Sequence, residues 1–402
     1  MKKKPVNVRR GDIMPQVREE VSHYHSRLIA DLRASGNVLH LPNMSIRLAS
    51  AFGFCDGVQR AIEIAYATFR VFAGRRIWLI GEIIHNPEVN AQLDALGLLH
   101  LPWNTTGEGY DHLTPDDVVI IPAFGISVEL RHMLETRGVQ LVDSTCGNVI
   151  KVWQRVRSYA SRGITSIIHG KVRHEESMAT ASHSLGDDRT GHFLVIFSEQ
   201  DARLLSDYIC GQGSKEAFLA HFKGCYSRGF DPDIHLDTIG MANQTTMLKD
   251  ETTRIQHILS SAIAQRDGDT SRFHAFDTIC GATQDRQQAL FDLLDEPLDT
   301  MFIIGGYNSS NTTHLASISA RRRPTFFVRD ASCLQSLASV TAFDPYTRQV
   351  HTQPLPAEAA DLSRIWRIGI TAGASCPANI IEGVIRRLAS LRGLSIDTPP
   401  SD

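Results

Sequence analysis

The sequence predicts an α/β protein built on parallel β-sheets. From residue 45 onward, short apolar runs of strand length alternate with longer stretches of helical periodicity, and strands that alternate with helices form parallel sheets. Polar clusters follow nearly every apolar run. Parallel sheets collect ligands at the carboxyl ends of their strands, so these clusters mark the candidate functional positions. A length of 402 residues allows two or three domains.

Composition excludes several classes of protein. Hydrophobic residues make up 42% and charged residues 21% of the chain, as in ordinary globular proteins. The net charge of −3 argues against a general nucleic-acid binder, which carries a basic field. No apolar run reaches the roughly 18 residues of a transmembrane helix, and no apolar segment of a secretory signal follows the basic start. Seven cysteines without a short repeating spacing suit a reducing cytoplasm.

The elements are predicted in chain order from these patterns. Residues 1–44 are polar, with one helical stretch around 17–32, and are expected to pack on the outside as an extension. Strands are predicted at 77–81, 117–123, 139–142, 165–169, 193–197, 239–242, 300–306, 324–328 and 365–371. Helices are predicted at 58–72, 128–136, 147–161, 199–209, 282–294 and 380–391, with others ending near 96 and beginning near 170–176, 250 and 313.

Two segments depart from this alternation of strands and helices. Residues 211–237 are rich in Gly, Lys and Asp and are interpreted as an insertion, and residues 331–364 are expected to be irregular. The predicted organisation is therefore an extension (1–44), three α/β units (45–146, 147–279 with the insertion, and 280–395) and a tail (396–402).

Three cysteines occupy equivalent places in the pattern. Cys55, Cys146 and Cys280 each stand where an apolar segment gives way to a predicted helix. The positive end of a helix dipole lowers the pKa of a thiol and favours the thiolate. Three such thiolates are soft ligands that suit an iron–sulfur cluster or zinc. Cys210, Cys225 and Cys333 lie in the insertion or in irregular segments and are interpreted as bystanders.

Several turns carry polar residues with two possible readings. The turns at 308–313 and 373–375 offer hydroxyls and main-chain N–H groups to an anion such as phosphate, and simple helix capping is the commoner role. His85 and His174 are either ligands or structural donors. Glu176 is either an acid–base group or a partner of the helix dipole.

Eight segments, taken together, resemble one family: Gly53-Phe-Cys-Asp-Gly-Val, Glu82-Ile-Ile-His-Asn-Pro, Asp143-Ser-Thr-Cys, His169-Gly-Lys-Val-Arg-His-Glu-Glu, Ala242-Asn-Gln-Thr-Thr-Met-Leu-Lys, Thr278-Ile-Cys-Gly-Ala-Thr-Gln, Gly305-Gly-Tyr-Asn-Ser-Ser-Asn and Thr371-Ala-Gly-Ala-Ser. The family is 4-hydroxy-3-methylbut-2-enyl diphosphate reductase. The N-terminal extension, Pro122-Ala-Phe-Gly and the 211–237 insertion resemble its plant and cyanobacterial branch.

The resemblance implies a trefoil of three α/β units around a central [4Fe–4S] cluster. Cys55, Cys146 and Cys280 would hold the cluster and leave one iron open to the substrate, with Glu176 as proton donor and Thr245 beside the substrate hydroxyl. The residues implied for diphosphate binding are His85, His174, Ser309, Ser310, Asn311 and Ser375. The implied electron donor is ferredoxin or flavodoxin, and neither nucleic acid nor membrane is an expected partner.

The implied reaction is the last step of the non-mevalonate isoprenoid route. It removes the allylic hydroxyl of 4-hydroxy-3-methylbut-2-enyl diphosphate with two electrons and two protons, which gives isopentenyl and dimethylallyl diphosphate. The alternatives are a non-catalytic iron–sulfur sensor, a paralogue acting on a different allylic diphosphate, and a cluster-free cysteine enzyme that binds phosphate.

Several positions depart from the usual family pattern. Phe124 replaces a further histidine of the common bacterial branch, and Gly147, Cys376 and Ala378 are unusual at their positions. Cys376 could reach the open iron as a fourth ligand. We expect it instead to be a small buried hydrophobic residue, as free cysteines commonly are.

Overall fold

The computed structural model describes residues 6–276 and 278–396. Asp277 in the expected turn before Cys280, the first five residues of the expected extension, and positions 397–402 of the expected tail lie outside the described residues. The chain forms two compact units. Unit 1 comprises Met1–Val8, Thr68–Ile83 and Leu96–Cys280, and unit 2 comprises Arg9–Ala67, Ile84–Ala95 and Gly281–Asp402.

Unit 1 contains two parallel sheets, of which the first has the order β4-β3-β5-β6. Its strands are β3 (Ile77–Ile80), β4 (Leu99–Leu101), β5 (Val118–Ile121) and β6 (Gln140–Asp143). Every residue of β5 is buried, because an inner strand of a parallel sheet is covered on both faces. Helix α5 (Val128–Arg137) is capped at its start by Ser127, whose hydroxyl accepts a hydrogen bond from Leu130 N. It ends before Gly138, whose backbone has the left-handed conformation.

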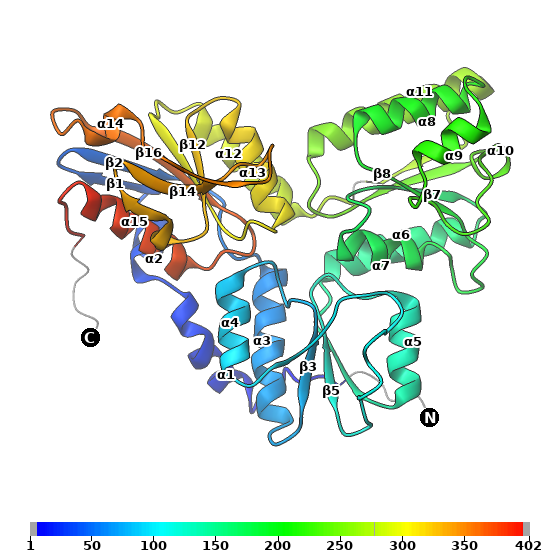
Figure 1. Ribbon diagram of the computed structural model, residues 1–402, viewed down its shortest axis with the longest axis horizontal. Coiled ribbons are helices and arrows are strands. Elements are labelled where there is room, and N and C mark those ends of the chain that lie inside the picture. Colours follow the sequence, from blue (N-terminus) through cyan, green and yellow to red (C-terminus); the bar gives the residue numbers. More distant parts are fainter. Residues whose placement is uncertain (1–5, 277, 397–402) are drawn as a thin grey trace. The chain divides into compact units, whose positions relative to one another are not determined.

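The second sheet of unit 1 has the order β10-β9-β7-β8 and is also parallel throughout. Its strands are β7 (Thr165–His169), β8 (Phe193–Ile196), β9 (Ile239–Asn243) and β10 (Phe273–Ala275). Helices α8 (Glu199–Ile209) and α11 (Lys249–Asp267) pack together on one face, and α6 (Gly147–Ala160) and α7 (Glu175–His183) cover the other (Figure 1). Adjacent Ile167 and Ile168 accordingly belong to different core clusters, because successive strand residues face opposite sides.

The main sheet of unit 2 has the order β1-β2-β16-β11-β12. Its strands are β1 (Val38–Leu41), β2 (Met44–Leu48), β11 (Thr300–Ile304), β12 (Thr325–Val328) and β16 (Trp366–Ala372). The β1–β2 hairpin is antiparallel, and all other pairs are parallel. The helices that accompany the parallel strands are α12 (Gly281–Leu294), α13 (Ser310–Ala320) and α15 (Ala378–Leu391).

The same strand order is repeated in the three sheets. Across the three sheets, the strands lie in the orders β4-β3-β5-β6, β8-β7-β9-β10 and β12-β11-β16-β2. Along the chain, the second strand of each set comes first, the edge strand next to it comes second, and the third strand of the set follows. The fourth strand of the last set, β2, comes from the N-terminal part of the chain. Each fourth strand leads to one of the cysteines 146, 280 and 55. The predicted α/β class with parallel sheets is confirmed.

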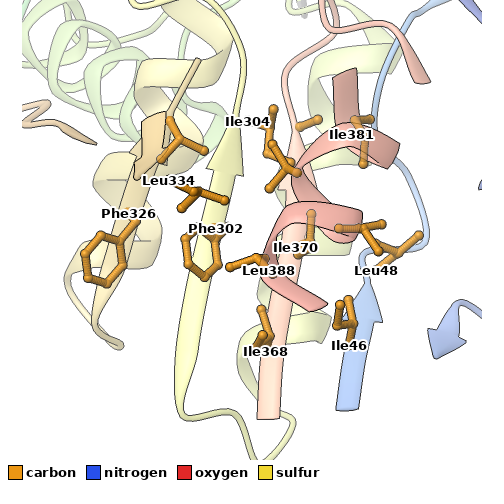
Figure 2. Packing of buried hydrophobic residues seen from close by; sticks show 14 of the residues in the cluster. Ile46, Leu48, Phe302, Ile304, Phe326, Leu334, Ile368, Ile370, Ile381 and Leu388 are labelled. Carbon is orange, nitrogen blue, oxygen red and sulfur yellow. The ribbon is translucent and has the colours of Figure 1, made fainter. Parts of the chain in front are cut away.

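Side chains of the inner strand positions form the core of unit 2. Ile46, Leu48, Phe302, Ile368 and Ile370 stand on one face of the sheet, and residues of α15 such as Ile381 and Leu388 pack over them (Figure 2). Alternate strand residues point to the same face, which explains the spacing of two within each strand. Burial of these aliphatic and aromatic groups is the main stabilising contribution to this sheet.

The N-terminal segment is part of this core, so the expectation that it packs outside was wrong. It contains α1 (Met14–Glu20), a 3₁₀ turn (Val21–Tyr24) and α2 (Arg27–Ala34). Leu28, Ile29 and Leu32 of α2 are buried in the same cluster as the sheet residues. Helix α2 is amphipathic, with Leu28, Ile29 and Leu32 buried. The residues that flank it are rich in charged and polar side chains, and they conceal this short apolar stripe in the sequence.

Residues 331–364 were expected to be irregular, and this was also wrong. They form a small antiparallel sheet of β13 (Leu334–Ser336), β14 (Ser339–Phe343) and β15 (Val350–Gln353), followed by the short helix α14 (Ala357–Ala360). Val340 and Ala342 of β14 are buried in the unit 2 core. β15 is exposed at all its residues, so it lacks the alternation that identifies a half-buried strand.

The remaining predicted strands and helices form at or within two residues of their expected bounds, except that α13 begins at Ser310, three residues before its expected start. The 211–237 segment contains α9 (Lys215–His221) and α10 (Pro232–His235), while α3 (Asp56–Val71) and α4 (Pro87–Ala95) complete the helices. The expected domain boundaries stay a prediction, although β2 pairs with β16 rather than with strands of the first expected unit. Among the described residues, no helix is long and apolar enough to cross a membrane.

Candidate functional site

A buried carboxylate–threonine pair lies at the carboxyl ends of β7 and β9. These strands are neighbours, with His169 opposite Asn243, so the turns that follow them meet. Thr245 donates two hydrogen bonds to Glu176, from N to Oε1 at 2.6 Å and from Oγ1 to Oε2 at 3.1 Å. Glu176 is 2% and Thr245 is 5% exposed. Burial with both oxygens engaged holds the carboxylate in one orientation, as a positioned acid–base group requires.

His174 caps the helix that carries Glu176. Its Nδ1 accepts a hydrogen bond from Glu176 N at 3.2 Å, so the proton of the neutral ring is assigned to Nε2. The ring is mostly buried and stands edge-on to Phe124, with the ring centroids 5.9 Å apart. His174 therefore has the structural role of a helix cap. The assigned tautomer also presents an N–H donor at Nε2.

Gln244 ties the two turns together, a role that the sequence did not predict. Its Oε1 accepts hydrogen bonds from Lys171 N at 3.1 Å and from Ser177 Oγ at 3.3 Å. Its Nε2 donates to Thr246 Oγ1 at 2.8 Å. Gln244 is 1% exposed, so these bonds form in a protected environment where they hold geometry best. The available signal was its place beside Thr245 in a polar strand-end cluster.

Two of the predicted cysteine ligands belong to unit 1. Cys146 is the N-cap residue of α6, and its N donates to Ala123 O at 3.0 Å. Cys280 immediately precedes α12, and its N donates to Thr245 O at 3.2 Å. Both side chains are partly buried. A main-chain hydrogen bond therefore connects the turn of Cys280 directly to the threonine that binds Glu176.

In unit 2, the turns after β11 and β16 lie side by side because these strands are adjacent, with Ile304 opposite Ala372. Ser375 Oγ donates to the carbonyl oxygen of His85 at 3.1 Å. A Cβ at Gly306 would lie 2.6 Å from that same oxygen, and one at Gly373 would lie 1.9 Å from Thr312 Oγ1. Only glycine fits at these two close approaches.

The α13 N-terminus contains both a cap and an unused amide. Ser309 caps the helix, accepting hydrogen bonds from Thr312 N at 3.3 Å and Thr312 Oγ1 at 3.0 Å. Asn311 is 4% exposed, yet neither its Oδ1 nor its Nδ2 has a hydrogen-bond partner among the described residues. Ser310 beside it is also buried. A buried amide without partners is costly unless a ligand satisfies it, and a helix N-terminus favours an anion.

The third predicted ligand, Cys55, belongs to unit 2. It is partly buried and directly precedes α3, and its N donates to Ala374 O at 3.2 Å. Cys376, in contrast, is fully buried in the unit 2 core, where burial raises the pKa of its thiol. The expectation that Cys376 is a small buried hydrophobic residue is confirmed.

The predicted bystander cysteines pack against hydrophobic clusters. Cys333 is buried in the unit 2 core, and Cys210 and Cys225 are partly buried beside the cluster of α8 and α11. Burial also raises the pKa of the Cys225 thiol, and Asp201 adds to the shift. These thiols therefore have apolar surroundings, whereas the three predicted ligands stand in strand-to-helix turns.

Fold and site together define a class: a parallel α/β protein with cysteines in repeated strand-to-helix turns, a buried carboxylate–threonine pair and a buried amide without a partner at a helix N-terminus. The chain belongs to the LytB family, whose model, described as LytB protein, matches residues 46–389.

Relatives and solved structures agree with this membership. A 4-hydroxy-3-methylbut-2-enyl diphosphate reductase of Synechococcus sp. (strain RCC307) is 45% identical over 371 residues, covering 92% of this chain and 89% of the relative. The protein of that name from Gloeobacter violaceus (strain ATCC 29082 / PCC 7421) is 42% identical over 381 residues, covering 93% and 89%. These relatives confirm the cyanobacterial resemblance.

A solved structure of (E)-4-hydroxy-3-methyl-but-2-enyl diphosphate reductase, described as the terminal enzyme of the non-mevalonate pathway, is 26% identical. Its TM-score is 0.52, and the match covers 86% of this chain and 99% of that one. The Plasmodium falciparum structure of E-1-hydroxy-2-methyl-but-2-enyl-4-diphosphate reductase has a TM-score of 0.61 at 20% identity, covering 86% of this chain and 87% of that one, and supports the fold alone.

Proposed function

We propose that this protein reductively removes the hydroxyl of 4-hydroxy-3-methylbut-2-enyl diphosphate, giving isopentenyl and dimethylallyl diphosphate, the last step of the non-mevalonate isoprenoid pathway. The observation that carries the proposal is the hydrogen-bonded set of Glu176, Thr245 and Cys280. Glu176 accepts from Thr245 N and Oγ1, and Thr245 O accepts from Cys280 N. The proposed proton donor, hydroxyl contact and cluster ligand are thus joined by direct hydrogen bonds.

The residues fit the expected [4Fe–4S] cluster. Cys55, Cys146 and Cys280 are partly buried, and each stands directly before a helix. Cysteine sulfur is the ligand that iron–sulfur clusters prefer. When bound by these three thiolates, the cluster would supply the electrons of the reduction. Cys376 is left out of the proposed ligand set because it is buried in the apolar core.

The diphosphate would be held by groups from two turns and two histidines. Asn311 offers an amide without a partner among the described residues, and Ser309 and Ser310 stand at the same helix N-terminus. Ser375, His85 and His174 complete the proposed set. Hydroxyl, amide and imidazole donors together with the helix dipole suit a dense negative charge.

Glu176 would move the proton. Departure of the allylic hydroxyl as water needs a proton at its oxygen, and a positioned carboxylic acid can deliver it. The Thr245 hydroxyl, hydrogen-bonded to Glu176, would then contact the same substrate oxygen. Because both groups are almost completely buried, bulk water is kept away from the transferred proton.

A non-catalytic iron–sulfur sensor is the second candidate. The buried Glu176–Thr245 pair and the unused amide of Asn311 argue against it, because a sensor needs neither an acid–base group nor an anion cradle. A paralogue acting on another allylic diphosphate would keep both features. Ferredoxin or flavodoxin as electron donor and a cytoplasmic location belong to the same proposal.

Anaerobic purification followed by a reduced-dye assay tests the function. The protein should be brown, contain iron and sulfide, and oxidise the dye only when 4-hydroxy-3-methylbut-2-enyl diphosphate is present. A colourless protein would support the cluster-free cysteine enzyme. A brown protein without turnover would support the sensor, and turnover only with a different allylic diphosphate would identify a paralogue.

A further inference from the structure

Unit 1 contains a cavity of about 610 Å³ that the proposed reaction does not use. It lies beside α7, between the start of α5 and the 211–237 segment. Its volume falls in the range of about 300–1,000 Å³ that is typical of sites for small organic ligands. No predicted site residue lines it.

The floor of the cavity is apolar. It is lined by Val172, Met178, Ala181, Leu185, Phe193 and Val195. Ala181 and Val195 belong to a buried cluster with Ile168, and Val172 and Phe193 pack against that cluster. The floor is therefore continuous with the core of the second sheet, and a hydrocarbon chain would gain from contact with it.

The rim of the cavity carries unpaired positive charge. Arg173 and Arg228 line it and are exposed, and neither has a hydrogen bond or an ion pair among the described residues. The carboxylate of Glu129 also lines the cavity, but it is already engaged, since it pairs with Arg189 and accepts a hydrogen bond from Ser182 Oγ at 2.5 Å. Two free guanidinium groups suit a phosphate or diphosphate, which they can bind through paired hydrogen bonds.

The 211–237 segment builds one wall of the cavity. β8 is an edge strand, and the segment hydrogen-bonds to it: Val195 N donates to Cys225 O at 2.7 Å, and Ser227 N donates to Phe193 O at 3.2 Å. These bonds fix the main chain immediately before Arg228. The segment thus positions a cation at the rim and covers an otherwise open sheet edge.

The cavity and the proposed catalytic pair use opposite faces of α7. Met178, Ala181 and Ser182 follow the spacing of one face of α7 and line the cavity, and Leu185, in the turn after the helix, lines it as well. Glu176 lies about half a turn away from that face, where it meets Thr245. The cavity is therefore a separate site on the same helix.

We propose that this cavity binds an isoprenoid diphosphate with a longer chain than the five-carbon products. The diphosphate would bind Arg173 and Arg228, and the prenyl chain would lie on the apolar floor. The choice of an isoprenoid among anionic amphiphiles rests on the proposed function, whose products have this chemistry. A five-carbon chain is too short to cover a floor of six apolar side chains.

Equilibrium titration of the full-length, anaerobically purified protein tests the site, with geranyl diphosphate, inorganic pyrophosphate and geraniol as probes. Geranyl diphosphate should bind more tightly than either other probe. Its dissociation constant should rise about tenfold in Arg228→Ala and further in Arg173→Ala/Arg228→Ala, since each loses a charge-assisted hydrogen bond. Lys223→Ala is the matched control, because Lys223 is an exposed cation of the same segment that does not line the cavity.

A floor variant separates the apolar part of the site from the cationic part. Met178 is only partly buried, so Met178→Glu should fold and should abolish geranyl diphosphate binding. Equal affinities for pyrophosphate and geranyl diphosphate would overturn the proposal, because the protein would then recognise an anion alone. Unchanged binding in the double arginine variant, or an equal loss in Lys223→Ala, would also overturn it.

Turnover distinguishes failure of this site from failure of the proposed function. Arg228→Ala should stay within about twofold of the parent in dye oxidation, as exposed substitutions usually do. Normal turnover without arginine-dependent binding of geranyl diphosphate would refute the cavity site alone. Arginine-dependent binding in a protein without turnover would refute the reductase and keep the cavity as a site for anionic amphiphiles.

Discussion

At the scale of single residues, Glu176 has the most sharply defined surroundings. Both of its oxygens accept hydrogen bonds from Thr245, and its side chain is almost completely buried. Glutamine in its place would keep the shape and much of the hydrogen bonding but could not release a proton. The contribution of this residue can therefore be separated from that of the fold.

Glu176→Gln should lower kcat by about 10²–10⁴-fold, the usual contribution of general acid catalysis, while iron content and substrate binding stay unchanged. Reduced-dye turnover and a substrate titration measure both quantities. Glu175→Gln is the matched control, since Glu175 is the neighbouring carboxylate and its side chain is 29% exposed. Near-normal turnover in Glu176→Gln would remove this residue from the mechanism.

Asn311 allows a test in which stability and binding move in different directions. Its buried amide has no partner among the described residues, and an unsatisfied buried polar group costs about 1–3 kcal/mol. Asn311→Leu should therefore keep or raise the thermal midpoint without substrate and raise KM about tenfold or more. Thermal denaturation and steady-state kinetics check the two parts.

Asn90→Leu is the control for that experiment. Asn90 is also a buried asparagine of unit 2, but its Nδ2 donates to Ile84 O at 2.9 Å. Its replacement should lower the thermal midpoint, because the carbonyl loses its partner. An equal destabilisation by both substitutions would show that Asn311 has a structural role.

At the scale of elements, the cysteine turns repeat one design. Each follows the fourth strand of a parallel sheet, each precedes a helix, and each donates its main-chain N–H to a neighbouring turn. Replacing Cys55, Cys146 or Cys280 by Ser should remove most of the iron and sulfide from the purified protein, because hydroxyl is a poor ligand for iron–sulfur clusters.

Cys225→Ser should keep the full iron and sulfide content, since Cys225 packs beside the apolar cluster of α8 and α11. Chemical analysis of iron and sulfide, with circular dichroism to confirm folding, compares the variants. Full cluster content in Cys146→Ser would contradict the proposed ligand set.

The central strand β7 carries a histidine that links stability to pH. Burial lowers the pKa of His169 from 6.5 to about 4, so the folded protein keeps it neutral while the unfolded chain takes up a proton below pH 6.5. Stability should therefore fall as the pH decreases from 6.5 toward 4, with His169 contributing about 2 kcal/mol of the loss between pH 7 and 5.

His169→Asn should reduce this loss, as measured by the denaturant midpoint at both pH values. The exposed His257 provides the control variant His257→Asn, which should retain the parent pH dependence. An identical pH dependence in His169→Asn and the parent would show that His169 does not contribute.

At the scale of the whole molecule, distant parts of the sequence complete unit 2 together. β2 pairs with β16, and α2 shares a core with α15. The N-terminal segment is therefore needed for stability, although its composition is that of a surface extension. Ile29, at 1% exposure, is the most deeply buried aliphatic residue of α2.

Ile29→Ala should destabilise unit 2 by about 2–5 kcal/mol, the cost of truncating a buried aliphatic side chain. Ile234→Ala, at a residue that is 64% exposed, should change stability little. Denaturant titration with a tryptophan signal is suitable, because Trp366 lies fully buried in the same core. A similar, small effect of both substitutions would restore the view of an outer extension.

The sequence by itself determined the α/β class, the bounds of most helices and of nine strands, and the places of Cys55, Cys146 and Cys280 directly before helices. These features depend on local periodicity and on the order of strand, turn and helix, which neighbouring residues encode. It also identified Glu176, Thr245 and Asn311 as candidates, through polar clusters at strand ends and through the family resemblance.

Only the tertiary structure decided which distant segments meet. Residues far apart in the chain meet where β2 pairs with β16 and where α2 is buried in the core. They also meet in the hydrogen bonds of Gln244 and in the cavity beside α7. Such contacts depend on the packing of complete sheets and helices, and the identity of a glutamine or arginine does not reveal its partner. For the same reason, the unused amide of Asn311 and the free guanidinium groups of Arg173 and Arg228 became visible only in the fold.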